Sequence, residues 1–131
     1  MIPVFQTRYG NSGNCYQAAL ASLLELPIDG VPDFVHQYGP LWFEQCGQWL
    51  AARNLSIIEV RIPMLGPSMI YMPEQPIYHL ISGKSPRGLL HSVVALQGRM
   101  VHDPHPDGRG LVEPHSFDFL VALNPAHHKD S

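Results

Sequence analysis

The spacing of hydrophobic side chains predicts helices in the first part of the chain. Residues 14–26 are rich in helix-forming types, and the larger apolar side chains recur every three or four positions until the chain reaches Pro27. The same spacing returns over residues 41–53, and Asn54 follows as a residue suited to end a helix. Residues 28–40 lack this period, so we expect a loop between two helices.

Beyond Asn54 the pattern changes to the alternation that is typical of half-buried strands. Residues 56–62 alternate in this way and are rich in β-branched types. Further strands are predicted over residues 77–82, 89–96, 99–103 and 117–123. Residues 63–76 are interrupted by prolines and a glycine and form a long predicted loop. Helices followed by an antiparallel sheet make an α+β fold.

Length and composition indicate one compact domain. The chain has 131 residues, of which 45% are hydrophobic, and a chain of this length rarely contains a second independent domain. We assign residues 1–125 to the domain and expect residues 126–131 to be a flexible C-terminal tail. No feature of the sequence specifies an oligomeric state.

Charge and hydropathy exclude several classes of partner. The 8 Lys and Arg residues are outnumbered by 11 Asp and Glu residues, and the formal net charge is -3, so we do not expect a surface that follows nucleic-acid phosphates. No stretch approaches the roughly 18 consecutive apolar residues of a membrane-spanning helix, and the start of the chain lacks the pattern of a signal peptide. We therefore expect no nucleic-acid partner, no membrane association and a cytoplasmic location.

The thiol of Cys15 is the first candidate for chemistry. It lies in the expected first turn of the first helix, after the flexible segment 10–14. Free N–H groups and the positive end of the helix dipole at such a position favour the thiolate, which is the nucleophilic form of cysteine. The second cysteine, Cys46, falls among apolar positions of the second helix and is predicted to be a core residue.

His91 and Asp103 are candidate partners of this thiol. His91 lies within an otherwise apolar strand, where burial without a partner would cost free energy. Asp103 lies at the end of the next predicted strand, from which a carboxylate can hold one tautomer of an imidazole.

The turn between these two strands decides whether His91 and Asp103 share a face. A three-residue turn over residues 96–98 pairs Ala95 with Arg99 and makes the numbers of paired residues sum to an even value, which brings Asp103 opposite His91. A two-residue turn would make the sum odd and place the neighbouring histidine there instead. We predict the three-residue turn, because Gly98 then occupies the left-handed position that this turn requires.

Together these residues resemble the papain-like cysteine peptidases, and within them the small bacterial peptidase domains of bacteriocin exporters. The resemblance rests on Gln6, on residues 14–24, on residues 91–94 and on the dipeptide 103–104. It implies a papain-like fold, in which N-terminal helices pack on an antiparallel β-sheet.

The resemblance also implies a role for each matching residue. Cys15 would be the nucleophile, His91 the base and Asp103 the residue that orients the base. Gln6 would help to form the oxyanion hole. The stretch from Gln6 to Cys15 is longer than the usual pattern, however, which leaves Asn14 as a competing oxyanion donor, together with Asn11. Tyr16 departs from the family pattern, where a small residue often follows the cysteine, and it would narrow the cleft beside the substrate.

The implied chemistry is acyl transfer to Cys15. The thiolate would attack a carbonyl of a peptide, protein or small amide substrate, and water would resolve the thioester, so no cofactor is expected. Arg87, in the predicted hairpin loop 83–88, would help to position the substrate. An acyltransferase would use the same three residues with another nucleophile in place of water.

Two other readings compete with this one. His and Asp side chains of a kind that can bind zinc or iron gather near the C-terminal part of the chain; they are His102, Asp103, His105, Asp107 and His115. A non-catalytic binding module is the other alternative, with Tyr71, Met72 and Tyr78 as a contact surface. The long loop 63–76 is of a kind that often carries binding residues or covers a cleft, and it would form a lid over Cys15.

Overall fold

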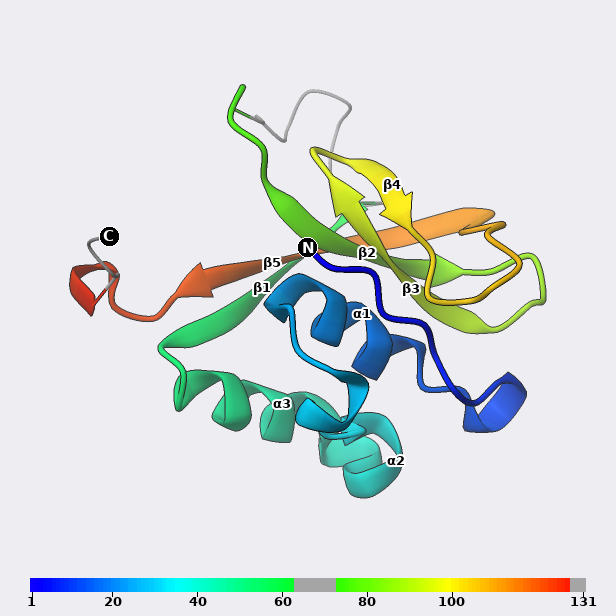
Figure 1. Cartoon of the computed structure of the whole chain (residues 1–131), viewed down its shortest axis with the longest axis horizontal. Helices are drawn as coiled ribbons and strands as arrows, with labels where there is room; N and C mark the ends of the chain where they lie inside the picture. The colour runs from blue at the N-terminus through cyan, green and yellow to red at the C-terminus, as the bar shows by residue number, and fades with distance from the viewer. Residues whose placement is uncertain (63–72, 128–131) are drawn as a thin grey trace.

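A computed structural model describes residues 1–62 and 73–127 and shows helices packed on one face of a sheet (Figure 1). The helices are α1 (Cys15–Leu24), α2 (Phe34–Tyr38) and α3 (Trp42–Ala51). The strands are β1 (Leu55–Arg61), β2 (Tyr78–Lys84), β3 (Leu90–Leu96), β4 (Arg99–His102) and β5 (Glu113–Ala122). Short 3-10 turns are η1 (Gly10–Ser12), η2 (Ile28–Gly30), η3 (Gly39–Leu41) and η5 (Pro125–His127). The α+β class predicted from the sequence is confirmed.

Helix α1 lies where its sequence pattern predicts and is the central helix of the fold. Asn14 is its N-cap residue, and Glu25 ends it in a left-handed conformation with φ 57°. Its buried side chains are mostly small, as at Ala18 and Ala21, so the helix can lie close to β3 and β2, against which it packs. This packing sets the first turn of α1 beside the start of β3.

The prediction of a loop over residues 28–40 is wrong in part, because α2 lies within it. Phe34 is 3% exposed and packs edge-on against Trp49 of α3 at a centroid distance of 5.8 Å. A helix of five residues is too short to be stable by itself or to show a hydrophobic period. Its tertiary contacts with α3, and not a sequence pattern, account for it.

All neighbouring strands of the sheet are antiparallel, in the order β1-β5-β2-β3-β4. The last strand in the chain, β5, therefore lies between β1 and β2. The predicted bounds of the first four strands are within two residues of the observed ones. Strand β5 begins at Glu113 and not at 117, because its first part contains Pro114 and polar residues that hide the strand pattern.

The two faces of the sheet bury separate hydrophobic clusters. The face toward the helices buries Leu20, Cys46, Leu50, Leu80 and Val94 among others. The opposite face buries Ile81, Val93 and Ala95, with Leu111 and Phe117 partly buried against them. Full burial of one such aliphatic side chain stabilises the fold by roughly 1.5–3 kcal/mol. The prediction that Cys46 is a core residue is confirmed.

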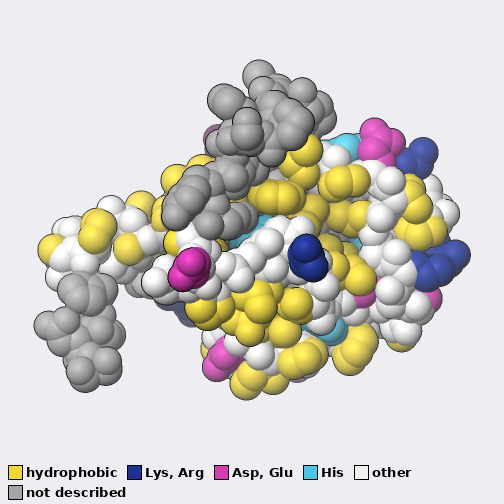
Figure 2. All heavy atoms as spheres, turned by 90° about the horizontal axis from the view of Figure 1, so that it is seen from above, with side chains coloured by type: hydrophobic (Ala, Val, Ile, Leu, Met, Phe, Trp, Pro, Cys, Tyr) yellow, Lys and Arg dark blue, Asp and Glu magenta, His cyan; other side chains and the backbone are white. Residues whose placement is uncertain are grey.

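The surface seen from above is rich in apolar side chains. Figure 2 shows hydrophobic side chains over much of the centre of this view and charged side chains mainly toward its right-hand edge. The edge strand β4 contributes two exposed hydrophobic residues, Met100 and Val101. Within the described ranges, no helix combines the length and the hydropathy needed to cross a membrane.

Some predictions fall partly outside the described residues. In the predicted C-terminal tail, His127 belongs to the short turn η5, whereas residues 128–131 are not described. Residues 63–72 of the predicted loop 63–76 are not described either. The predictions that this loop covers a cleft and that Tyr71 and Met72 belong to a contact surface therefore fall outside the described residues.

Candidate functional site

Cys15 is the first residue of α1, and its thiol is free and partly exposed. The chain that leads to it is held by the side chain of Asn14. Asn14 Oδ1 accepts the backbone N–H groups of Thr7 and Arg8 at 2.9 and 3.0 Å. Both N–H groups of the Asn14 amide are also engaged, with Thr7 Oγ1 at 3.0 Å and Gln17 Oε1 at 3.1 Å. Asn14 thus fixes the segment before the helix, and its side-chain amide has no N–H left for a ligand.

The turn between β3 and β4 has two residues, so the predicted three-residue turn is wrong. Leu96 pairs with Arg99, and Gln97 and Gly98 form the turn with φ 49° and 84°. Two successive left-handed residues are typical of a type I′ hairpin turn. The backbone N–H of Gly98 donates to Nε2 of His79 at 2.9 Å, and this contact from β2 helps to hold the short turn.

A β-bulge then corrects the parity that the short turn would have produced. Ala95 pairs with Met100, and not with Arg99 as predicted, but the next pair is Val94 with His102. The register thus skips Val101 and changes from an odd to an even sum of residue numbers. Asp103 consequently comes to the side of His91, as predicted, although a bulge and not the turn brings it there.

His91 and Asp103 form a buried pair. His91 Nε2 lies 2.6 Å from Asp103 Oδ1, and the side chains are only 3% and 2% exposed. The same carboxylate accepts two backbone N–H groups, from His105 to Oδ1 at 2.9 Å and from Gly110 to Oδ2 at 2.8 Å. The loop after β4 therefore wraps around Asp103 and fixes its orientation toward the imidazole.

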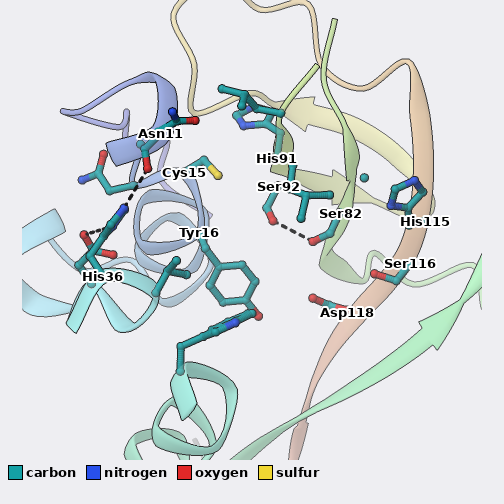
Figure 3. A pocket seen from close by; sticks show the side chains of 18 of the residues that line it. Asn11, Cys15, Tyr16, His36, Ser82, His91, Ser92, His115, Ser116 and Asp118 are labelled. Atoms are coloured by element: carbon teal, nitrogen blue, oxygen red, sulfur yellow. Dashed lines mark hydrogen bonds and ion pairs between the residues drawn. The ribbon is translucent and has the colours of Figure 1, made fainter. Parts of the chain in front are cut away.

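The electrostatics of the pair favour a charged imidazole. Burial alone would lower the pKa of His91, but its hydrogen bond with Asp103 and its interaction with the Cys15 side chain raise it to about 9. Burial would raise the pKa of Asp103, but hydrogen bonds from His91 and from the two backbone N–H groups lower it. Since Nε2 faces Asp103, the other ring nitrogen, Nδ1, is the one available to Cys15. Figure 3 shows Cys15 and His91 side by side across the gap between α1 and β3.

Two cavities meet at Cys15 and His91. The larger has a volume of about 970 Å³ and extends between the helices and the sheet, a size typical of ligand sites. The smaller, of about 40 Å³, has room for roughly one water molecule. Cys15 and His91 line both cavities.

Gln6 lies in the smaller cavity beside the nucleophile. Its backbone N–H donates to the carbonyl of Pro104 at 3.0 Å, which ties the N-terminal segment to the residue after Asp103. Its side chain is buried, and Nε2 donates one N–H to the carbonyl of Arg8 at 2.9 Å. A second N–H of this amide remains, in contrast to the fully engaged amide of Asn14.

The two residues predicted to contact substrate lie in different cavities. Tyr16 lines the larger one, packs edge-on against Trp42 at a centroid distance of 4.9 Å, and points its hydroxyl toward Asp118 (Figure 3). Arg87 lies in the loop between β2 and β3, as predicted. It lines the smaller cavity and forms an ion pair with Asp107.

The five residues considered as a metal site do not converge. His102 Nε2 bonds the carbonyl of Val4 at 2.8 Å, Asp103 faces His91, and His115 lies apart on β5. Within the described part of the chain, no group of three or more His, Cys, Asp or Glu side chains is arranged to hold a metal ion.

The sequence analysis missed the polar floor of the larger cavity. Three serines on adjacent strands, Ser92, Ser82 and Ser116, are register partners across the sheet, and Asp118 follows on β5. Ser82 and Ser92 share a hydrogen bond of 2.8 Å between their hydroxyls. The signal was present in β5, where Ser116 and Asp118 alternate with phenylalanines and make one face of that strand polar.

Comparison with known proteins finds no matching family model, no matching curated protein and no matching solved structure.

Proposed function

We propose that the protein is a cysteine-dependent hydrolase of the papain-like type, a peptidase or amidase that acts through Cys15, His91 and Asp103. The observation that carries this proposal is the buried bond between His91 Nε2 and Asp103 Oδ1. It orients the ring so that Nδ1 is left for the thiol at the first turn of α1. A helix with the cysteine at its first residue, packed on an antiparallel sheet that bears the histidine, supports the papain-like comparison.

Acylation starts from a thiolate and a protonated imidazole. The Cys15 sulfur forms a bond to the substrate carbonyl carbon, and the carbonyl electrons move to oxygen. The backbone N–H of Cys15 and the free N–H of the Gln6 amide would stabilise this oxyanion. His91 then donates its proton to the amide nitrogen, the C–N bond breaks, and an amine leaves with a thioester formed on Cys15.

Deacylation reverses the direction of proton transfer. Neutral His91 takes a proton from water, the hydroxide oxygen bonds to the thioester carbon, and the C–S bond breaks to release a carboxylic acid. The thiolate and the imidazolium are restored. Asp103 stays ionised throughout and favours the charged ring. An acyltransferase differs only in that another nucleophile replaces this water.

Alkylation of Cys15 tests the nucleophile. Iodoacetamide labelling, mapped by mass spectrometry between pH 5.5 and 9, is expected to be fast at pH 6 in the wild type and about tenfold or more slower in His91→Ala. Cys46 is an internal control, because burial raises the pKa of its thiol to about 12 and leaves it 0% exposed. Labelling of Cys15 that is no faster at pH 6 than that of glutathione, and indifferent to His91, would contradict the proposal.

Hydrolysis of p-nitrophenyl acetate tests the chemistry. The wild type is expected to release nitrophenol with a burst followed by turnover, since an acyl-enzyme forms. Cys15→Ser should lower the turnover rate by roughly 100-fold or more, and Gln6→Ala by roughly 100-fold if its amide meets the oxyanion. Unchanged turnover in Cys15→Ser would exclude the thiol as nucleophile.

A further inference from the structure

The larger cavity contains a carboxyl group that the proposed mechanism does not use. Asp118 on β5 is 4% exposed and lines this cavity together with Cys15. Its Oδ1 atom is buried and has no hydrogen-bond partner within the described ranges, and the same holds for the hydroxyl of Tyr16. Buried polar atoms without partners are costly. Two of them, on residues that line one cavity, indicate a place where a ligand would complete the hydrogen bonding.

Asp118 shares its cavity with the nucleophile, Cys15. Tyr16 directly follows Cys15 in the chain, and its phenol extends from α1 toward the carboxyl group on β5 (Figure 3). A substrate group bound at Asp118 would therefore belong to a part of the substrate close to the carbonyl that Cys15 attacks.

A second acidic residue lies directly beside Asp118. Glu59 on β1 is the direct register partner of Asp118 and lines the same cavity. Like charges directly opposite one another on neighbouring strands repel. Arg61 pairs with Glu59 at 3.1 Å, whereas Asp118 has no cationic partner in the part of the chain that the structure describes.

We propose that Asp118 binds a cationic group of the substrate, a guanidinium or an ammonium, in the cavity beside Cys15. The inference rests on the proposed function and names a class of substrate for it. Such a cation would donate hydrogen bonds to Asp118 Oδ1 and to the Tyr16 hydroxyl oxygen, and it would offset the repulsion from Glu59. The volume of about 970 Å³ is sufficient for a side chain of arginine size.

The ionisation of Asp118 makes this binding dependent on pH. Burial, followed by the charge of Glu59, raises the pKa of Asp118 to about 6, against the opposing effect of the nearby Ser116 and Tyr16 hydroxyls. The titratable groups that interact with it are Tyr16 on α1, Cys46 on α3 and Glu59 on β1. The other titratable or charged residues that line the cavity are Cys15, Asp33, His36, Arg61, His91 and His115. Because only the ionised carboxyl attracts a cation strongly, recognition should increase between pH 5 and pH 7.5.

Two matched alkylating reagents test the proposal. N-(4-guanidinobutyl)chloroacetamide carries the cation, and N-(4-ureidobutyl)chloroacetamide is its neutral isostere. At pH 7.5 the cationic reagent is expected to alkylate wild-type Cys15 about tenfold faster than the neutral one, the effect of one charge-assisted hydrogen bond. Because both reagents react with the same thiol, the ratio of their rates does not depend on the reactivity of that thiol. This ratio should decrease toward one at pH 5.

Asp118→Asn should bring this ratio to about one at pH 7.5 while the rate with plain iodoacetamide stays as in the wild type. Asp29→Asn removes the same charge at an exposed position on η2, outside the cavity, and should leave the ratio unchanged. Tyr16→Phe is a second variant of the site and should lower the ratio in part.

A wild-type ratio near one, or a ratio that Asp118→Asn does not change, would overturn this inference. If iodoacetamide labelling still depends on His91 in that case, the proposed function stands without it. Loss of the dependence on His91 would instead overturn the proposed function itself.

Discussion

His91 Nε2 lies 2.6 Å from Asp103 Oδ1, in a position where both side chains are almost fully buried. Removal of one partner from such a pair leaves an uncompensated charge, which typically costs 3–5 kcal/mol. Asp103 is also held by the backbone N–H groups of His105 and Gly110. The carboxylate is therefore the fixed member of the pair, and its position sets the orientation of the imidazole.

Asp103→Asn tests how much of the basicity of His91 comes from this carboxylate. The amide keeps a hydrogen-bond acceptor but no charge, so the pKa of His91 should fall from about 9 toward its ordinary value of 6.5. NMR titration of the His91 ring protons measures this change. A pKa that stays near 9 in the variant would mean that Cys15, not Asp103, is the main cause.

The pair should make stability depend on pH in a defined window. The pKa of His91 is raised in the folded state, so its contribution is complete below pH 6.5 and is lost as the pH rises through about 9. The pKa of Asp103 is lowered, so its contribution is complete above about pH 3.8 and is lost on further acidification. In urea unfolding, the free energy of unfolding of the wild type should therefore exceed that of Asp103→Ala by the largest amount between about pH 4 and 6.5. That difference should decrease as the pH rises to 9.5, by at most roughly 3 kcal/mol, because Cys15 contributes to the raised pKa of His91 as well. A difference independent of pH would contradict an ionised pair.

Gly83→Ala tests how closely β5 approaches β2 at the residue that is paired with His91. Gly83 is the register partner of His91, and a Cβ there would lie 2.1 Å from the carbonyl oxygen of Glu113. Since that oxygen belongs to the backbone, β5 would have to move, and we expect a loss of about 3 kcal/mol or more in the free energy of unfolding.

Gly47→Ala is the matched control for this substitution. Gly47 lies within α3, and a Cβ there would meet no atom within 4 Å. Alanine is a better helix former than glycine, so this variant should gain about 0.5–1 kcal/mol. Chemical denaturation measures the free energy of unfolding of both variants. Equal changes in the two variants would argue against the close contact between residue 83 and the backbone of β5.

Asp118→Asn should stabilise the protein at neutral pH, because the buried carboxyl ionises only at a cost. Its pKa is raised from 3.8 to about 6, so the wild type loses stability as the pH rises between these values. Relative to wild type, the free energy of unfolding of the variant should be about 2 kcal/mol more favourable at pH 7.5 than at pH 4.5. Thermal unfolding at the two pH values measures this difference. Asp29→Asn, at an exposed position, should stay within about 0.5 kcal/mol of wild type.

Much of the fold could be predicted from local patterns. Helices α1 and α3 and four strands could be predicted from helix-forming residue types, hydrophobic spacing and β-branched runs, which are properties of short segments. The order of helices before strands was sufficient for the α+β class. Helix α2 and the first part of β5 were missed, because contacts with Trp49 and with neighbouring strands hold them and leave little local signal.

The candidate site was predicted from the chemical types of Cys15, His91 and Asp103. Each of these residues lies in a context that favours a partner, and that context is visible in the sequence. The thiol lies at a helix start, the histidine in an apolar strand and the acid after the next strand. The role of Asp118 was not visible in this way, because a lone acid in a strand is unremarkable until its neighbours are known.

The sequence by itself determined which side chains are available for chemistry and on which elements they lie, because hydrophobic periodicity and turn residues act over short distances. Only the tertiary structure decided how the elements meet. The skip at Val101 brings Asp103 to the side of His91, and the insertion of β5 between β1 and β2 places Asp118 beside Glu59, where the Tyr16 hydroxyl points toward it. Register and strand order depend on the packing of residues far apart in the chain, so no local pattern contains them.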